Sequence, residues 1–164
     1  MNWKHMVWSQ FGAAIDALEN AMRLCPDRLW SGRSKWYDIW YISFHTLFWL
    51  DYYLEDSAED YKPIPPYTLS ELDPAGIVPD PPYTKEQLLA YLEHGRDKCK
   101  AYIERMTDEQ ADSPCGRDRL DLTRGELLLY SLRHVQHHAA QLNLLLRQII
   151  DDAPGWTFKS KDLE

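Results

Sequence analysis

Cysteine is scarce in this chain of 164 residues, and its three cysteines, Cys25, Cys99 and Cys115, lie far apart. No two of them form a CxxC pair, and an odd number of thiols cannot pair completely. The spacing argues against a disulfide framework and against a cysteine-rich zinc site. We therefore interpret all three as reduced thiols that are buried or inert.

The sequence also has no apolar run of about 18 residues, the length that a membrane-spanning helix needs. Residues 1–5, MNWKH, lack the apolar core and the small-residue cleavage site of a signal peptide. Basic residues are in deficit, since 18 Lys and Arg stand against 26 Asp and Glu, for a net charge of −8. Such a surface repels phosphate backbones and anionic lipid. We expect a cytoplasmic protein that binds neither nucleic acid nor membranes.

Alternating runs rich in valine or isoleucine, the pattern of strands, are absent as well, and helical periodicity dominates instead. Hydrophobic residues make up 45% of the chain and charged residues 27%, as in an ordinary globular protein. The length suits one core, so we expect a single domain over residues 1–164. Apolar spacing, with capping boxes at Thr84–Gln87 and Thr123–Glu126, predicts four long helices at residues 3–24, 34–56, 84–106 and 127–150.

The segment between the second and third predicted helices is rich in proline. Seven of the ten prolines lie in residues 57–83, which excludes a helix there. A linker between two domains would have this composition, but the chain on either side of the segment is short for a domain that folds alone. A crossover that covers part of a pocket is the better interpretation. The fold class that follows is all-α, a four-helix bundle with a long Pro-rich crossover between its second and third helices.

The second predicted helix, 34–56, carries apolar residues on nearly every side. Such a helix is either central in the bundle or also buried against a second subunit. It has more apolar faces than one bundle core can bury. We therefore expect a homodimer, for which isologous pairing is the commonest arrangement.

Three of the six histidines fall in one stretch of the last helix. His134 and His138 are four residues apart, so their imidazoles lie on one side of the helix, on an inward stripe with Tyr130 and Gln141. His137 points away, toward the flank of the bundle. Two buried imidazoles on one face need partners, and a divalent ion such as Zn, Ni, Cu or Fe satisfies both.

A third ligand has to come from another helix, and His45, in the middle of helix 34–56, is the candidate. Its stripe holds Asp38, Tyr41, Trp49 and Tyr52, an aromatic wall with polar tips that suits a small-molecule pocket. The predicted site has the metal ligands His45, His134 and His138 and the pocket residues Tyr41, Trp49, Tyr52, Tyr130 and Gln141.

Each of these assignments has a plainer alternative. A histidine on an apolar face is usually a core residue with one hydrogen bond, and an HxxxH pair without the central Glu of HExxH is not a protease motif. Asp38 either orients a ligand imidazole or favours the start of its helix through the helix dipole. We interpret Asp51 and Glu55 as solvated, and Arg133 and Arg147 as surface charges or as contacts for an anionic substrate.

With these residues in view, the chain resembles the DinB/YfiT-like superfamily of metalloenzymes. The resemblance rests on FHTLFWLD around His45 and on HVQHHAAQLN, which begins at His134. That family has one histidine in its second helix and an HxxxH pair in its last. Its members often have Gly where this chain has Ala140, a change that concerns helix packing. The resemblance implies a four-helix bundle, commonly a homodimer, with nickel or zinc on three histidines and water in the open positions.

A metal on three neutral imidazoles keeps its charge and an open position. It can lower the pKa of a bound water to about 7 or hold a thiol as thiolate. The family that the chain resembles includes S-transferases that use a low-molecular-weight thiol and a thiol-dependent isomerase. The resemblance therefore implies a low-molecular-weight thiol as a candidate cosubstrate. Three hypotheses follow. They are a metal-dependent enzyme that acts on a small molecule by thiol transfer or hydrolysis, a metal-binding bundle without catalysis, and a structural dimer with vestigial histidines.

Overall fold

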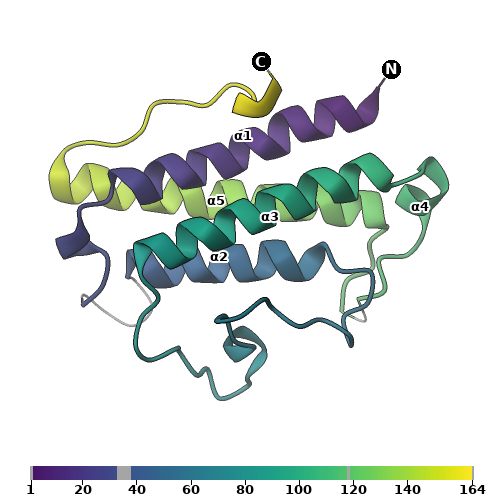
Figure 1. Ribbon diagram of the computed structural model, residues 1–164. Coiled ribbons are helices and arrows are strands. Elements are labelled where there is room, and N and C mark those ends of the chain that lie inside the picture. Colours follow the sequence, from purple (N-terminus) through teal and green to yellow (C-terminus); the bar gives the residue numbers. More distant parts are fainter. Residues whose placement is uncertain (1, 33–37, 118, 164) are drawn as a thin grey trace.

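The computed structural model describes residues 2–32, 38–117 and 119–163, and these residues form helices without a named strand (Figure 1). The predicted all-α class is confirmed. None of the helices in this part of the chain combines the length and the apolar character that crossing a membrane requires. The helices of the described residues are α1 (Trp3–Leu24), α2 (Ile39–Tyr53), α3 (Lys85–Arg105), the short α4 (Asp108–Asp112) and α5 (Arg124–Ile150), with 3₁₀ turns η1 (Asp27–Leu29), η2 (Ser70–Leu72) and η3 (Lys161–Leu163).

Helices α3 and α5 begin at side-chain caps. Thr84 and Thr123 each accept a hydrogen bond from the backbone N–H three residues further on. The side chains of Gln87 and Glu126 accept one from the backbone N–H of the threonine. Each pair satisfies two N–H groups that have no partner inside the helix. Both predicted capping boxes are confirmed.

Helix α2 is shorter than predicted. Its expected start at residues 34–37 lies outside the described residues, and it ends at Tyr53 rather than at residue 56. Beyond this end the next two N–H groups bond the carbonyls three residues before them, which tightens the last turn. Arg117, from a distant loop, donates from its Nη2 to the carbonyls of Tyr52 and Glu55. A tertiary contact thus caps the helix.

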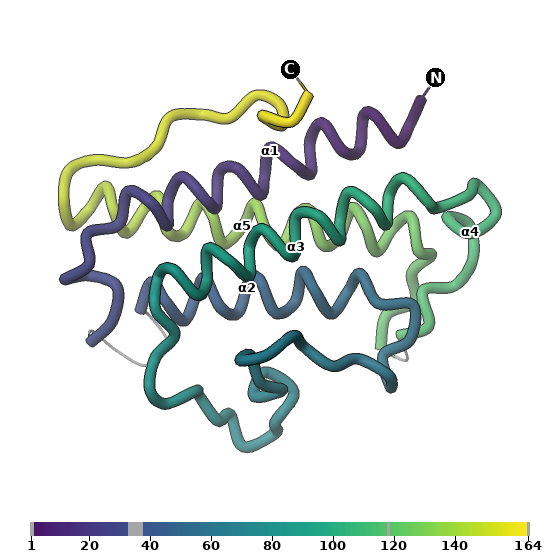
Figure 2. The backbone as a smooth tube through the Cα atoms, in the orientation of Figure 1, coloured from purple at the N-terminus to yellow at the C-terminus, as the bar shows by residue number. Residues whose placement is uncertain are grey.

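The long helices of the described chain lie side by side (Figure 2). Helix α1 contacts α3 and α5, and α2 contacts the same two helices. The largest fully buried side chains include Phe11 of α1, Phe44 and Phe48 of α2, and Tyr91 of α3. Because α2 and α5 are neighbours, side chains from the middle of both helices can meet.

The segment from residue 54 to residue 84, here called the crossover, joins α2 to α3 and covers α2 on one side (Figure 1). Its side chains Tyr61 and Tyr83 are buried. The ring of Tyr83 lies 4.9 Å from that of Phe44, and the ring of Tyr61 lies 5.5 Å from that of Phe48. The crossover therefore buries apolar surface of α2 within one chain. That surface no longer argues for a second subunit, although the homodimer itself stays a prediction.

The crossover also buries Asp51, so the prediction that this carboxylate is solvated is wrong. Its Oδ2 accepts hydrogen bonds of 2.9 Å from the hydroxyls of Tyr61 and Tyr91, and its Oδ1 forms an ion pair with Lys98. A buried carboxylate requires such partners. These contacts tie the crossover to both α2 and α3.

Residues after α5 fold back along α1, an arrangement that the sequence did not predict (Figure 2). The N–H of Ser160 donates to the carbonyl of Ser9 at 2.9 Å, and the N–H of Lys161 donates to Asp16 Oδ2 at 2.8 Å. The approach is so close that a Cβ on Gly12 would lie 2.3 Å from Ser160 Oγ. Only glycine leaves room for the segment at this position.

Replacing Gly12 with alanine is expected to lower the melting temperature by about 3–8 °C, because the added methyl group displaces the C-terminal segment from α1. Gly155→Ala is the matched control, since nothing lies within 4 Å of its added Cβ. A Ser160→Gly substitution in the Gly12→Ala background should restore part of the loss. Calorimetry measures all four proteins, and a Gly12→Ala protein that melts with the wild type would contradict the packing described.

Candidate metal centre

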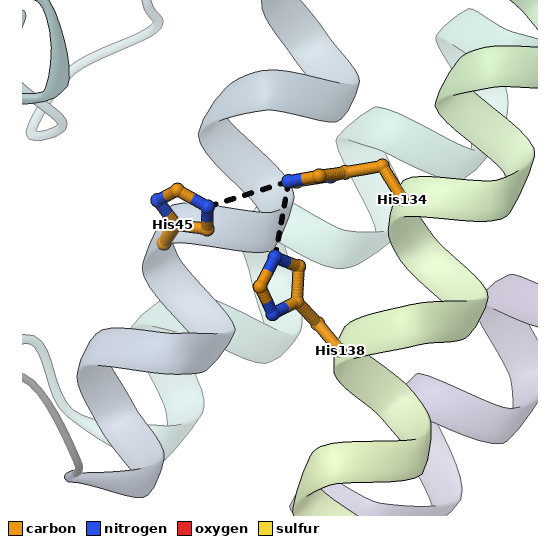
Figure 3. Close-up of side chains that lie close together, drawn as sticks. All are labelled: His45, His134 and His138. Carbon is orange, nitrogen blue, oxygen red and sulfur yellow. Dashed lines mark hydrogen bonds between the residues drawn. The ribbon is translucent and has the colours of Figure 1, made fainter.

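Helices α2 and α5 bring three histidines together where they meet (Figure 3). His45 comes from α2, and His134 and His138 come from successive turns of α5. The Nε2 of His134 lies 3.3 Å from the Nε2 of His45 and 3.1 Å from the Nε2 of His138. Within the described residues, these three form the one group of potential metal ligands whose ligand atoms all lie within 4.8 Å of one another.

Hydrogen bonds on the outer nitrogens determine where two of the imidazole protons lie. The carboxylate of Glu71 only accepts, so the Nδ1 of His45, 2.6 Å away, carries the proton. The amide oxygen of Gln141 accepts from the Nδ1 of His138 at 2.7 Å. Both neutral rings therefore present a lone pair on Nε2, and the Nε2 of His134 cannot donate a proton to both. A divalent cation at this point would bind all three lone pairs and remove this conflict.

Glu71 is the site residue that sequence reasoning missed. It lies in η2, inside the crossover, and its side chain is only 6% exposed. Its Oε2 also accepts from the Nε1 of Trp49 at 3.1 Å. Burial by itself would raise the pKa of Glu71, but hydrogen bonds from His45, Tyr41 and Trp49 hold that pKa below its ordinary value. The ionised carboxylate sets the tautomer and the orientation of His45.

Asp38 does not have the position that the sequence suggested for it. Its Oδ2 accepts from the N–H of Gly32 at 3.0 Å and from the Nε1 of Trp40 at 3.2 Å, at the N-terminal cap of α2. The outer nitrogen of His45 is bonded by Glu71. The carboxylate on this imidazole is therefore Glu71, and the alternative interpretation of Asp38, as a carboxylate at the start of its helix, fits its place.

The two nitrogen spacings at His134 suit a divalent transition metal. Nitrogens about 2.0–2.1 Å from zinc lie about 2.9 Å apart in an octahedral and about 3.4 Å apart in a tetrahedral arrangement. The two spacings at His134, 3.1 and 3.3 Å, fall between these values. Burial, followed by repulsion from the neighbouring histidines, lowers the pKa of His134 to about 3 and that of His138 to about 4. Both rings are neutral at pH 7, which is the form that binds metal.

The histidine stripe of α5 lies at the edge of the core rather than at its centre. The fully buried side chains of α5 include Val135, Ala139 and Leu142, which are offset around the helix from the stripe predicted to face inward. His134 and His138 are half-buried. Two ligands of a bound ion therefore come from the rim of the core, where a small molecule can reach them.

The predicted pocket residues lie at different distances from the histidines. Tyr41 and Trp49 flank His45, with ring centroids 6.2 and 6.3 Å from its imidazole. Gln141 bonds His138 through its oxygen and donates from its Nε2 to the Nε2 of His137 at 3.2 Å. His137 thus reaches the cluster through a hydrogen bond from Gln141 and through its ring, which lies 5.1 Å from that of His138.

Tyr52 and Tyr130 pack on other aromatic rings. The ring of Tyr52 lies 6.4 Å from that of Phe48, and the ring of Tyr130 lies 5.4 Å from that of Tyr53. Tyr53 in turn lies 6.4 Å from His134. The sequence prediction omitted Tyr53, because its position on α2 falls outside the stripe of His45.

Two cavities adjoin the cluster. One, of about 720 Å³, lies at the C-terminal end of α2 and has Trp49 and Tyr52 in its wall. The other, of about 550 Å³, lies on the outer side of α5 and has Tyr130 and His134 in its wall. Side chains predicted to form a pocket therefore line cavities on two sides of the histidines.

Replacing Glu71 with glutamine is expected to weaken metal binding about 10- to 100-fold, because an amide has the same shape without the charge that strengthens His45 as a ligand. Glu59→Gln, on the exposed part of the crossover, is the matched control. Titration with zinc against a competing chelator measures both. Equal affinities in the two variants would mean that Glu71 does not support the site.

Comparison with known proteins agrees with this geometry. The sequence profile of the DinB superfamily matches residues 10–142, a stretch that contains α2, the crossover and all three histidines. No match was found among curated proteins or among solved structures. Since the matched stretch covers most of the 164 residues, this chain belongs to the DinB superfamily.

Proposed function

We propose that this chain is a metal-dependent enzyme of the DinB type that acts on a small molecule by thiol transfer or hydrolysis. Its long helices form a four-helix bundle, the Pro-rich crossover between α2 and α3 completes the site, and His45, His134 and His138 bind one divalent ion, nickel or zinc. The observation that carries the proposal is that the Nε2 atoms of the three histidines converge. In His45 and His138, a hydrogen bond from Nδ1 leaves the lone pair on Nε2.

A divalent ion on three neutral imidazoles supplies a position at which water or a low-molecular-weight thiol loses its proton near neutral pH. Residues of the chain orient the imidazoles around that position. Glu71 orients His45 and Gln141 orients His138, so neither ring has to reorganise. Tyr41 and Trp49 pack beside His45.

Two measurements separate this proposal from its alternatives. Elemental analysis of protein purified without a His tag is expected to find about one Ni or Zn per chain, and no metal would favour vestigial histidines. The metal-loaded protein is then assayed for thiol-dependent turnover of a chloronitrobenzene. His45→Ala should abolish turnover, whereas His5→Ala, which changes an exposed histidine of α1, should leave it unchanged. Bound metal without turnover would favour a sensor or sequestering protein.

We propose further that the protein is a homodimer. Leu129 and Leu144 of α5 are 50% and 58% exposed, and Ala140 is exposed on the same outer side of the helix. An apolar helix face of this kind is commonly covered by a second copy. Sedimentation equilibrium should give twice the chain mass, and Leu144→Glu should shift it to the chain mass. A wild-type monomer at micromolar concentration would refute the dimer.

A further inference from the structure

The cavity at the C-terminal end of α2 has aromatic walls. Its volume of about 720 Å³ lies within the range of small-molecule sites. Trp49, Tyr52 and Tyr53 line it from α2, and Leu72 lines it from the crossover. Aromatic side chains in such a wall bind the flat apolar part of a ligand.

Two of these aromatic side chains also contact the histidine cluster. The ring of Trp49 lies 6.3 Å from that of His45, and the ring of Tyr53 lies 6.4 Å from that of His134. Trp49 is held in place because its Nε1 donates to Glu71. Trp49 and Tyr53 therefore line the cavity and also contact the histidine cluster.

Arg117 gives this cavity a cation. The side chain lines the cavity, yet only 6% of the residue is exposed. Its Nη2 donates to the carbonyls of Tyr52 and Glu55, and its guanidinium lies 4.5 Å from the ring of Tyr52. Its Nε and Nη1 are buried and have no hydrogen-bond partner. Capping α2 therefore uses only part of the guanidinium.

The wall of the cavity holds acidic and basic side chains besides Arg117. Among the ion pairs found in residues 2–32, 38–117 and 119–163, none involves Arg117. Asp56 and Glu59 also line the cavity, and the two oxygens of Asp56 pair with Arg105 and Arg124. Arg119 adds a second cation to the wall. The Nε and Nη1 of this buried guanidinium lack hydrogen-bond partners, and an anionic ligand would supply them.

We propose that this cavity binds the organic substrate of the metal centre, and that this substrate is a flat aromatic molecule with an anionic group such as a carboxylate. The aromatic body packs against Trp49 and Tyr53, and the anionic group binds Arg117. Only the role of this ligand as a substrate rests on the proposed function. The binding of an aromatic anion in the cavity is independent of it, because the residues proposed to bind the anion are not the proposed metal ligands.

The test uses a pair of fluorescent probes that differ by one charge. Anilinonaphthalene sulfonate is an aromatic anion, and phenylnaphthylamine is its neutral parent. The chelator-treated wild-type protein is expected to bind the anion with the higher affinity, at one site. Arg117→Gln should weaken binding of the anion about tenfold and that of the neutral probe less than twofold. Arg117→Lys, which keeps the charge, should restore part of the difference. Arg147→Gln, at an exposed position of α5, is the matched control.

A second pair of variants locates the probes and does not depend on Arg117. Ala58→Phe places a ring in the cavity and should abolish binding of both probes. Ala140→Phe does the same in the cavity on α5 and should leave binding unchanged. If Arg117→Gln fails to fold, this pair and the preference of the wild type for the anion decide the question. Equal affinity for both probes, or loss of binding in Ala140→Phe alone, would overturn the proposal.

Failure of this site and failure of the metal enzyme give different results. A protein that holds no metal but prefers the anionic probe refutes the metal-dependent enzyme and leaves the cavity as an anion site. A protein that holds one ion and turns over the electrophile, but does not distinguish the probes, refutes only the cavity.

Discussion

Replacing any one of His45, His134 or His138 with alanine is expected to lower the affinity for a divalent metal at least tenfold. Each removes one of three nitrogens that converge within 4.8 Å, and two imidazoles cannot supply the site. Inductively coupled plasma analysis after dialysis against a weak chelator gives the metal content. The largest loss is expected for His45→Ala, because this change also removes one of the hydrogen-bond partners of the buried Glu71 carboxylate, the Nδ1 at 2.6 Å.

The matched control is His137→Ala, which lies next to His138 and should leave the metal content nearly unchanged. His137 contacts Gln141 and not the converging nitrogens in the described hydrogen bonds. An essential His137 with a dispensable His138 would mean that α5 is rotated relative to its position in the structure. His137 would then take the place of His138 among the metal ligands.

The three histidines could be predicted because helical spacing alone places them. His134 and His138 are one turn apart, and His45 lies at the middle of the helix that α5 contacts. Glu71 could not be found in this way. It comes from an irregular segment whose path depends on the burial of Tyr61 and Tyr83 against α2. No periodicity in the sequence indicates which residue of that segment faces the site.

Two expectations about α2 depended on what covers this apolar helix. The sequence does not show what covers it, and within the chain the crossover covers part of it. Asp51 was expected in solvent for that reason, yet tertiary hydroxyl groups bond it in the interior. Contacts made by irregular chain, including the C-terminal segment on Gly12, are decided by packing and leave no periodic signal.

Acidification is expected to leave the metal bound at a lower pH than free imidazole would allow. Free imidazole titrates near pH 6.5, which by itself predicts loss of the ion between about pH 7 and pH 5. In the folded chain, burial and then repulsion from neighbouring histidines lower the pKa of His134 to about 3 and that of His138 to about 4. Protons displace the ion from these two rings only as the pH approaches about 4. We therefore expect loss of the ion at a lower pH than the titration of free imidazole indicates.

The same shifts determine how the stability of the metal-free fold depends on pH. Between about pH 6.5 and pH 4 the unfolded chain protonates both histidines, whereas the folded chain keeps His134 and His138 neutral. The unfolded state binds more protons in this window, so the free energy of unfolding falls as the pH drops through it. Each ring contributes at most about 1.4 kcal/mol per pH unit.

Melting curves from pH 8 to pH 4, with and without chelator, measure both effects. The stabilisation by metal should stay constant down to about pH 5 and disappear near pH 4. The chelated protein should lose stability below about pH 6.5, with a smaller slope in His134→Gln and an unchanged slope in His5→Gln. If the metal-dependent shift is already lost between pH 7 and pH 6, the imidazoles titrate as they do in water. The rim of the core would then not shield the site, and the burial of His134 in the structure would have to be wrong.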